Sequence, residues 1–146
     1  MNSSSAPLRF TQSFEANLKD LPAMLKFART HIAKCGFDVR DGQRFEVAVE
    51  EALANVIFHA YGDRGGEVEI TVCYLEGKGL QFVIKDRGFP FNPLEHKVKL
   101  DKDLKLHERE VGGLGIPMIQ EFVDRIHYER QDPFNIFTLE KSLRSN

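Results

Sequence analysis

Three polar side chains spaced four residues apart in one apolar segment could do chemistry together. They are Glu51, Asn55 and His59. On a helix this spacing stacks them on one face, one turn apart. Burying a carboxylate or an amide without a partner costs about 1–3 kcal/mol, so a bound cation or polar ligand would supply what the apolar neighbours lack. The ordinary alternative is a solvated flank of an amphipathic helix, and this segment alone favours it.

A second candidate is the turn that begins at Asp86. This carboxylate falls where a strand should end, and Gly88 follows two residues later. It could accept a hydrogen bond from an exocyclic amine such as that of adenine, and the glycine would let a flat ring approach the backbone. An ordinary Asp-x-Gly turn is the alternative.

A third candidate is the glycine-rich start of a late helix. Gly112, Gly113 and Gly115 precede an apolar run over 116–123. Exposed amides at a helix N-terminus bind phosphate, and glycines let several amides crowd one anion. No Gly-Lys-Ser/Thr follows, which excludes a Walker A loop, and no strand leads directly in, as the dinucleotide fingerprint requires. A flexible turn is the alternative.

Hydrophobic periodicity indicates the elements that position these candidates. Apolar residues recur every three to four positions from Phe45 to Ala60, which predicts a helix opening at Asp41-Gly42. Gly36 is placed to end an earlier helix capped by Asp20. The expected order is a strand over 8–14, these two helices, strands over 68–75 and 80–85, a helix over 116–123, and strands over 125–130 and 135–143.

Because helices and strands do not alternate one for one, a doubly wound sheet is not expected. The prediction is an α+β fold, a two-layer α/β sandwich whose mostly antiparallel mixed sheet has helices on one face. The polar run over 94–110 is too long for an ordinary connection, and is predicted to be a functional lid or partly disordered.

Composition narrows the function classes. The chain has 146 residues, 42% of them hydrophobic and 29% charged, as in one soluble domain. Its net charge of −2 does not suggest nucleic-acid binding. Cys35 and Cys73 lack metal-ligand spacing and are expected to be free thiols in a reducing cytosol. Without a long apolar run or a signal peptide, a cytoplasmic protein with a flexible tail over 1–7 is expected.

The order of the three candidates matches a known family. Residues 45–61 resemble the segment that carries the signature Glu-Ala-x-x-Asn-x-x-x-His-Ala-Tyr in the anti-sigma-factor serine/threonine kinases, a branch of the GHKL superfamily with histidine-kinase-like ATPase domains. Residues 86–93 resemble the family's Asp-x-Gly-x-Pro-Phe-Asp-Pro motif, with Asn92 in place of the second Asp. Residues 112–116 resemble its Gly-Gly-x-Gly-Leu element. The resemblance covers roughly 8–143.

The resemblance implies a Bergerat-type ATP-binding domain over 8–146, with an ATP lid at about 91–111. It implies that Asn55 holds Mg²⁺ through its side-chain oxygen and that Glu51 is the general base for an attacking hydroxyl. Asp86 would read the adenine amine, with Gly88 beside it. His59 would fix the helix or the adenine-side wall.

The phosphate contacts implied by the resemblance come from the lid and from the helix that follows it. Main-chain amides of Gly112, Gly113, Leu114 and Gly115 would hold phosphate. Lid cations, Lys105 and Arg109, would reach the γ-phosphate.

The resemblance also implies partners. Members of this branch phosphorylate a serine or threonine of a small anti-sigma-factor antagonist and sequester a sigma factor or similar target, usually as homodimers. Neither direct nucleic-acid binding nor membrane association is implied.

Three alternatives compete with this interpretation. A sensor histidine kinase needs an upstream helix with a phospho-accepting histidine, and a gyrase- or MutL-type ATPase needs a following transducer domain; neither is expected here. A non-enzymatic module that keeps the pocket or the fold to grip a regulatory partner is the stronger alternative.

Overall fold

The computed structural model describes residues 8–61, 65–75, 77–95 and 116–143. Within them, five strands form one sheet in the order β1-β2-β3-β5-β4, and each of its four pairings is antiparallel. The strands are β1 (Arg9–Glu15), β2 (Glu67–Leu75), β3 (Gly79–Asp86), β4 (Arg125–Gln131) and β5 (Phe134–Ser142).

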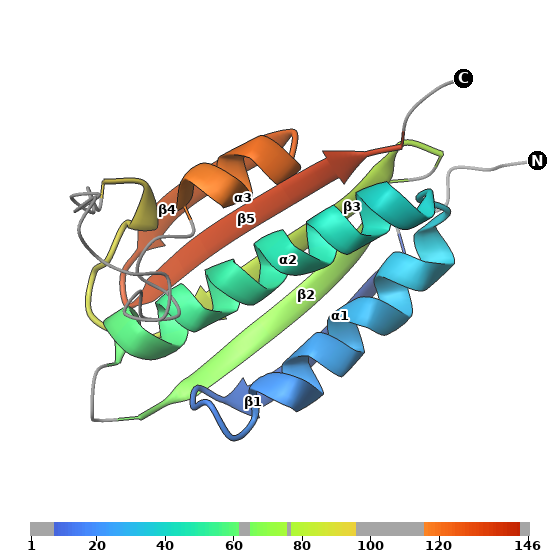
Figure 1. The fold of residues 1–146 in the computed structure, drawn as a ribbon. Helices are drawn as coiled ribbons and strands as arrows, with labels where there is room; N and C mark the ends of the chain where they lie inside the picture. Colours follow the sequence, from blue (N-terminus) through green and yellow to red (C-terminus); the bar gives the residue numbers. More distant parts are fainter. Residues whose placement is uncertain (1–7, 62–64, 76, 96–115, 144–146) are drawn as a thin grey trace, which may run out of the picture.

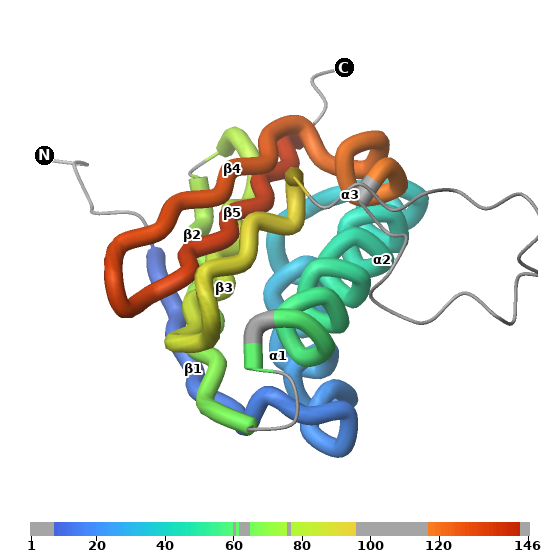
Figure 2. The backbone as a smooth tube through the Cα atoms, turned by 90° about the vertical axis from the view of Figure 1, so that its left-hand side faces the viewer, coloured from blue at the N-terminus to red at the C-terminus, as the bar shows by residue number. Residues whose placement is uncertain are grey.

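The helices lie on one side of this sheet (Figures 1 and 2). They are α1 (Leu21–Cys35), α2 (Val39–Asn55) and the short α3 (Ile116–Phe122). A π-helical turn, η1 (Val56–Ala60), continues α2, and a 3₁₀ turn, η3 (Pro93–Glu95), follows β3. This is the two-layer α+β arrangement that the sequence predicts.

The helix starts differ from the sequence prediction. Asp20 precedes α1, but its side chain makes no cap; Oδ2 instead accepts from the Glu15 amide at 3.2 Å. The predicted opening of α2 at Asp41-Gly42 is wrong, because Asp38 has an extended backbone and its Oδ1 accepts from the Asp41 amide at 2.7 Å. A side chain in that position satisfies an amide of the first helical turn, so the helix begins at Val39. Gly36 ends α1 as predicted, at φ +102°.

The core fills the space between the sheet and α1 and α2. Inward-facing residues of β2 and β3 alternate as predicted, and all six are buried: Val68, Ile70, Val72, Leu80, Phe82 and Ile84. Opposite them, α2 contributes a stripe that includes Phe45, Val49 and Ala52, each with no exposed surface. The sheet and α2 therefore hold each other rigidly, and residues at their ends are positioned by the core. None of the helices in the described residues combines the length and apolar character needed to cross a membrane.

Candidate active site

Asn55 is the last residue of α2 and is almost completely buried, with 3% of its surface exposed. Its Nδ2 is buried and has no hydrogen-bond partner among the described residues. A buried donor without a partner costs about 1–3 kcal/mol, which indicates a ligand atom as the missing partner. Rotating the amide by 180° exchanges its donor and acceptor, so the same position can present an oxygen to a cation.

Glu51 lies one turn before Asn55 on α2 and is partly buried. The predicted stacking of these two side chains on one helix face is confirmed, since both belong to the regular part of the helix. The stacking does not extend to His59 in the same way, because the helix widens to a π-turn at Val56. Such turns occur frequently at functional sites.

His59 contacts the segment that follows β3. Its ring stacks on that of Phe91, with centroids 5.0 Å apart and an interplanar angle of 22°. The end of α2 and the beginning of the predicted lid, two segments far apart in sequence, are therefore side by side.

Asp86 is the last residue of β3 and is 3% exposed. Its Oδ1 accepts two hydrogen bonds, from the Gly88 amide at 2.8 Å and from Asn135 Nδ2 at 2.9 Å. Burial raises the pKa of Asp86; the bonds from Asn135 and Gly88 and the charge of Arg130 offset only part of that effect. Neither bond uses Oδ2, so within the described part of the chain the carboxylate is held in a fixed orientation with one oxygen available for a ligand.

Asn135 is the residue that the sequence interpretation missed. It lies directly opposite Asp86 in the β3–β5 ladder and is 3% exposed. Its Nδ2 donates to Asp86 Oδ1 and, at 2.8 Å, to the Phe89 carbonyl; its Oδ1 accepts from the Phe91 amide at 3.3 Å and from the Tyr128 hydroxyl. One side chain thus joins the carboxylate to the loop behind it. A signal existed, since Asn135 shares the inward-facing positions of β5 with Phe137 and Leu139.

Two further contacts fix the loop after Asp86. The Tyr61 hydroxyl donates to the Glu67 carbonyl at 2.6 Å and accepts from the Arg87 amide at 2.7 Å. Arg130 Nη1 donates to the Gly88 carbonyl at 3.0 Å. Tyr61 follows the helix end and Arg130 belongs to β4, so two separate segments of the chain anchor the loop.

Asn92 departs from the family motif without losing a local function. Its Oδ1 accepts from the Leu94 amide at 2.9 Å, which stabilises the start of η3. An amide oxygen serves this turn as a carboxylate would, although it carries no charge.

Comparison with known proteins agrees with this geometry. A model of the histidine kinase-like ATPase domain matches residues 14–141. The chain belongs to that family. Serine-protein kinase RsbW of Bacillus thuringiensis (strain Al Hakam) is 30% identical over 108 residues, which cover 71% of this chain and 67% of the relative. The same figures hold for serine-protein kinase RsbW of Bacillus cereus (strain 03BB102) and Bacillus anthracis (strain CDC 684).

Membership of the histidine-kinase-like ATPase family confirms the resemblance to anti-sigma-factor kinases drawn from the three motifs, and it implies ATP binding. The described half of the expected pocket contains Glu51, Asn55, Asp86 and Gly88. Six expected phosphate contacts lie outside the described residues: Lys105, Arg109, Gly112, Gly113, Leu114 and Gly115. Of the expected lid over 91–111, only the part up to Glu95 is described.

The described residues of the ATPase domain contain no group of three or more His, Cys, Asp or Glu side chains that could hold a metal ion. Mg²⁺ commonly keeps several waters and binds through one or two protein oxygens plus substrate phosphates. Asn55, a buried amide with an unsatisfied end, fits that mode, in which the nucleotide supplies most of the ligands.

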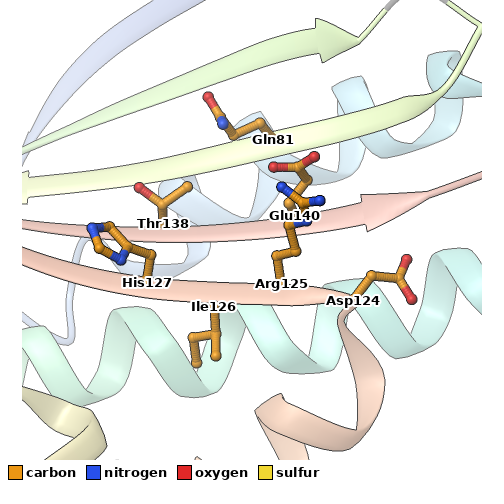
Figure 3. A pocket seen from close by; sticks show the side chains of 7 residues that line it. All are labelled: Gln81, Asp124, Arg125, Ile126, His127, Thr138 and Glu140. Carbon is orange, nitrogen blue, oxygen red and sulfur yellow. The ribbon is translucent and has the colours of Figure 1, made fainter.

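A pocket of about 740 Å³ lies elsewhere, over β3, β4 and β5 (Figure 3). Gln81, Arg125, His127, Thr138 and Glu140 are among its lining residues. None of the candidate nucleotide residues lines it, so size alone does not identify the functional site of this domain.

Proposed function

We propose that this protein binds Mg·ATP and transfers the γ-phosphoryl group to a serine or threonine hydroxyl of a partner protein. The observation that carries the proposal is the buried Nδ2 of Asn55, which has no hydrogen-bond partner among the described residues and lies one helical turn after Glu51 in a histidine-kinase-like ATPase domain. The names of the relatives, serine-protein kinases, support a protein hydroxyl as acceptor.

Asp86 would recognise the adenine base. Its Oδ1 is already occupied by Gly88 and Asn135, and Oδ2 would accept from the exocyclic amine. Guanine presents a carbonyl oxygen at the corresponding position, which would face the carboxylate with like partial charge. The fixed orientation of Asp86 therefore favours ATP over GTP.

Asn55 would hold Mg²⁺, which neutralises phosphate charge when bound. Main-chain amides of Gly112, Gly113, Leu114 and Gly115, and the cations Lys105 and Arg109, would complete the phosphate site. These assignments rest on the family motif and on the known affinity of helix N-termini and cations for phosphate. The lid over about 91–111 would cover the nucleotide.

Glu51 would act as the general base. It would take the proton of the acceptor hydroxyl as the new oxygen–phosphorus bond forms and the bond from the γ-phosphorus to the bridging oxygen breaks, which releases ADP. Its position on α2, one turn from the metal-binding amide, would place it beside the γ-phosphate.

The partner would be a small anti-sigma-factor antagonist, and the regulated target a sigma factor or similar protein. In this scheme, a cytoplasmic homodimer sequesters the target. Phosphorylation of the antagonist prevents the antagonist from displacing the target. This part of the proposal rests on the resemblance to the kinase branch.

The test is transfer of labelled phosphate from Mg·ATP to a serine-containing antagonist. Glu51→Gln should retain ATP binding and lose roughly 10²–10⁴-fold in transfer rate, since a carboxamide cannot take the proton. Glu50→Gln is the matched control on the neighbouring position and should transfer at the parent rate. If Glu51→Gln transfers as fast as the parent, Glu51 is not the base. ATP binding without transfer by the parent would favour the non-enzymatic binding module.

A further inference from the structure

A second cavity, of about 290 Å³, lies between helix α1 and the edge strand β1. One residue of β1 and five of α1 line it: Gln12, Ala23, Lys26, Phe27, Thr30 and His31. None of these residues belongs to the proposed nucleotide site. The volume is close to the lower end of the range for small-molecule pockets, so the cavity has the size of a site for a ligand with one ring.

His31 is the buried polar residue of this cavity, with 7% of its surface exposed. Three aromatic rings pack on its imidazole. Phe10 is stacked at a centroid distance of 4.7 Å, and Phe27 and Tyr74 lie edge-on at 4.9 and 5.7 Å. Its Nδ1 is 2.8 Å from the Tyr74 hydroxyl oxygen. The packing and the hydrogen bond together hold the imidazole in one orientation.

The proton on the imidazole can be assigned from the hydroxyl of Tyr74. That hydroxyl donates to the His31 carbonyl at 3.2 Å, so it has no second proton for Nδ1. The bond between Nδ1 and the hydroxyl oxygen therefore uses a proton on Nδ1. Burial, and then the charge of Lys34, lowers the pKa of His31, which favours the neutral ring. In this neutral form Nε2 carries no proton and is a hydrogen-bond acceptor.

Nε2 of His31 is open to the cavity. It has no hydrogen-bond partner within the described part of the chain. In that part, Asn55 Nδ2 is the one side-chain nitrogen or oxygen that is both completely buried and without a partner. Nε2 is therefore accessible, and the cavity is the space that His31 lines. An acceptor held in a fixed orientation at the wall of a small cavity favours a ligand that donates a hydrogen bond.

The other lining groups indicate what the rest of the ligand must be. The Thr30 hydroxyl donates to the Lys26 carbonyl at 2.9 Å, so its oxygen is left to accept. The Lys26 ammonium has no ion-pair partner among the described residues. Phe27 supplies an aromatic wall. The cavity therefore combines hydrogen-bond acceptors, an aromatic surface and one unpaired positive charge.

From this combination we infer that the cavity between α1 and β1 binds a small aromatic acid that carries a hydroxyl group, as 4-hydroxybenzoate does. The hydroxyl donates to His31 Nε2, the ring packs on Phe27, and the carboxylate lies beside Lys26. From Lys26 to His31 the helix rises about 7.5 Å, which matches one ring with substituents at opposite positions. The larger pocket over β3, β4 and β5 offers no such arrangement, because none of its lining residues is buried.

The inference goes beyond the proposed kinase activity and does not depend on it, because its test needs no nucleotide. NMR titration of the full chain with 4-hydroxybenzoate should give a Kd of roughly 0.1–1 mM, as expected for about ten non-hydrogen atoms. Benzoate, which lacks the hydroxyl, should bind about tenfold more weakly. 4-Hydroxybenzyl alcohol, which lacks the charge, should bind roughly two- to fivefold more weakly. Equal affinities for the three compounds would overturn the inference.

Two alanines of α1 separate binding from folding. Ala23 and Ala33 are both exposed, but Ala33 does not line the cavity. Ala23→Phe should fill the cavity and abolish binding of 4-hydroxybenzoate, whereas Ala33→Phe should bind it like the parent. Because neither alanine is in the core, both variants should melt near the parent's temperature. Equal binding by the two variants would contradict a ligand in this cavity.

His31 is tested by two replacements that each keep one of its polar positions. The amide of Asn lies where Nδ1 does and can still donate to the Tyr74 hydroxyl, whereas the amide of Gln reaches the position of Nε2. His31→Asn should lose most of the preference for 4-hydroxybenzoate over benzoate, and His31→Gln should retain part of it. The measured quantity is a ratio of two Kd values in one variant, so a general loss of stability does not mimic the result. A preference that is unchanged in His31→Asn, or that both variants lose equally, would overturn the assignment of Nε2 as the acceptor and with it the inference.

Discussion

The two ends of the proposed nucleotide site are built in opposite ways. At the base end, Asp86 and Asn135 are buried and joined by hydrogen bonds, and Tyr61 and Arg130 anchor the loop beside them. At the metal end, Asn55 is equally buried, yet its Nδ2 has no partner among the described residues.

The difference indicates which part of recognition is complete before the ligand arrives. A hydrogen-bonded polar network gains stability from its own contacts, whereas a buried group without a partner costs stability until a ligand or another group supplies the bond. We therefore expect base recognition to be preorganised, and the metal–phosphate end to be completed by Mg·ATP. Substitutions at the two ends should separate stability from binding.

The largest effect should come from Asn135→Ala. Removing this side chain deletes its bonds to the Phe89 carbonyl, the Phe91 amide and the Tyr128 hydroxyl, and also its bond to Asp86. The free protein should lose about 3 kcal/mol or more of unfolding free energy. Urea denaturation measures this. Thr138→Ala, on the opposite face of β5, is the control and should lower the free energy of unfolding much less. Equal losses for the two variants would show that the hydrogen bonds of Asn135 do not contribute more to stability than an ordinary position in β5.

Asp86→Asn should act mainly on binding. It loses a charge-assisted bond to the adenine amine, worth about 1.5–3 kcal/mol, so ATP affinity should fall roughly 10–100-fold and the preference for ATP over GTP should shrink. Calorimetric titration with both nucleotides measures the ratio. Asp124→Asn, at the far end of the sheet, should leave it unchanged. If Asp86→Asn keeps the parent's selectivity, Asp86 does not read the base.

A smaller effect should appear with pH. Burial raises the pKa of Asp86 above its ordinary 3.8, and the ionised form accepts a stronger hydrogen bond from the adenine amine than the protonated form does. ATP affinity should therefore decline as the pH falls toward that raised pKa, before an unperturbed carboxyl would titrate. The free energy of unfolding depends on pH in the opposite sense. Because the folded state binds the Asp86 proton more tightly than the unfolded state does, the contribution of Asp86 to stability is fully present below pH 3.8. That contribution is lost as the pH rises through the raised pKa of the folded state.

The pH dependence is separable from the titration of the nucleotide itself. Affinity measured in parallel for Asp86→Asn should lack the component due to this carboxyl. Identical pH profiles for parent and variant would contradict the assignment of a shifted Asp86 to base recognition.

Much of the fold was predictable because it depends on local patterns. The alternation in β2 and β3, the apolar stripe of α2 and the glycine at the end of α1 all act within a few residues. The start of α2 was not predictable, since Asp38 and Asp41 are both good capping residues. Only the backbone conformation shows which of the two side chains accepts the capping hydrogen bond. The π-turn after Asn55 also leaves no periodic signal in five residues.

The candidate site shows the same contrast between residues in local motifs and residues that act through long-range pairing. Glu51, Asn55 and Asp86 belong to short motifs that can be recognised in sequence. Asn135 acts on Asp86 across a strand ladder, from 49 residues away, so its role emerges only when β5 pairs with β3. Tyr61 was visible in a motif, but its bond to the Arg87 amide depends on the same long-range assembly.

The most direct test compares melting temperatures of the parent and Asn55→Ala, with and without ATP and Mg²⁺. A ligand at a hundredfold excess over its Kd adds about 2.7 kcal/mol, which is several degrees for a chain of this size. The parent should gain this shift only with Mg²⁺ present. Without ligand, Asn55→Ala should melt at the same temperature as the parent, because it removes a donor that has no partner in the described part of the structure, and it should gain nothing from Mg·ATP. A variant that is stabilised by Mg·ATP like the parent would contradict the metal assignment.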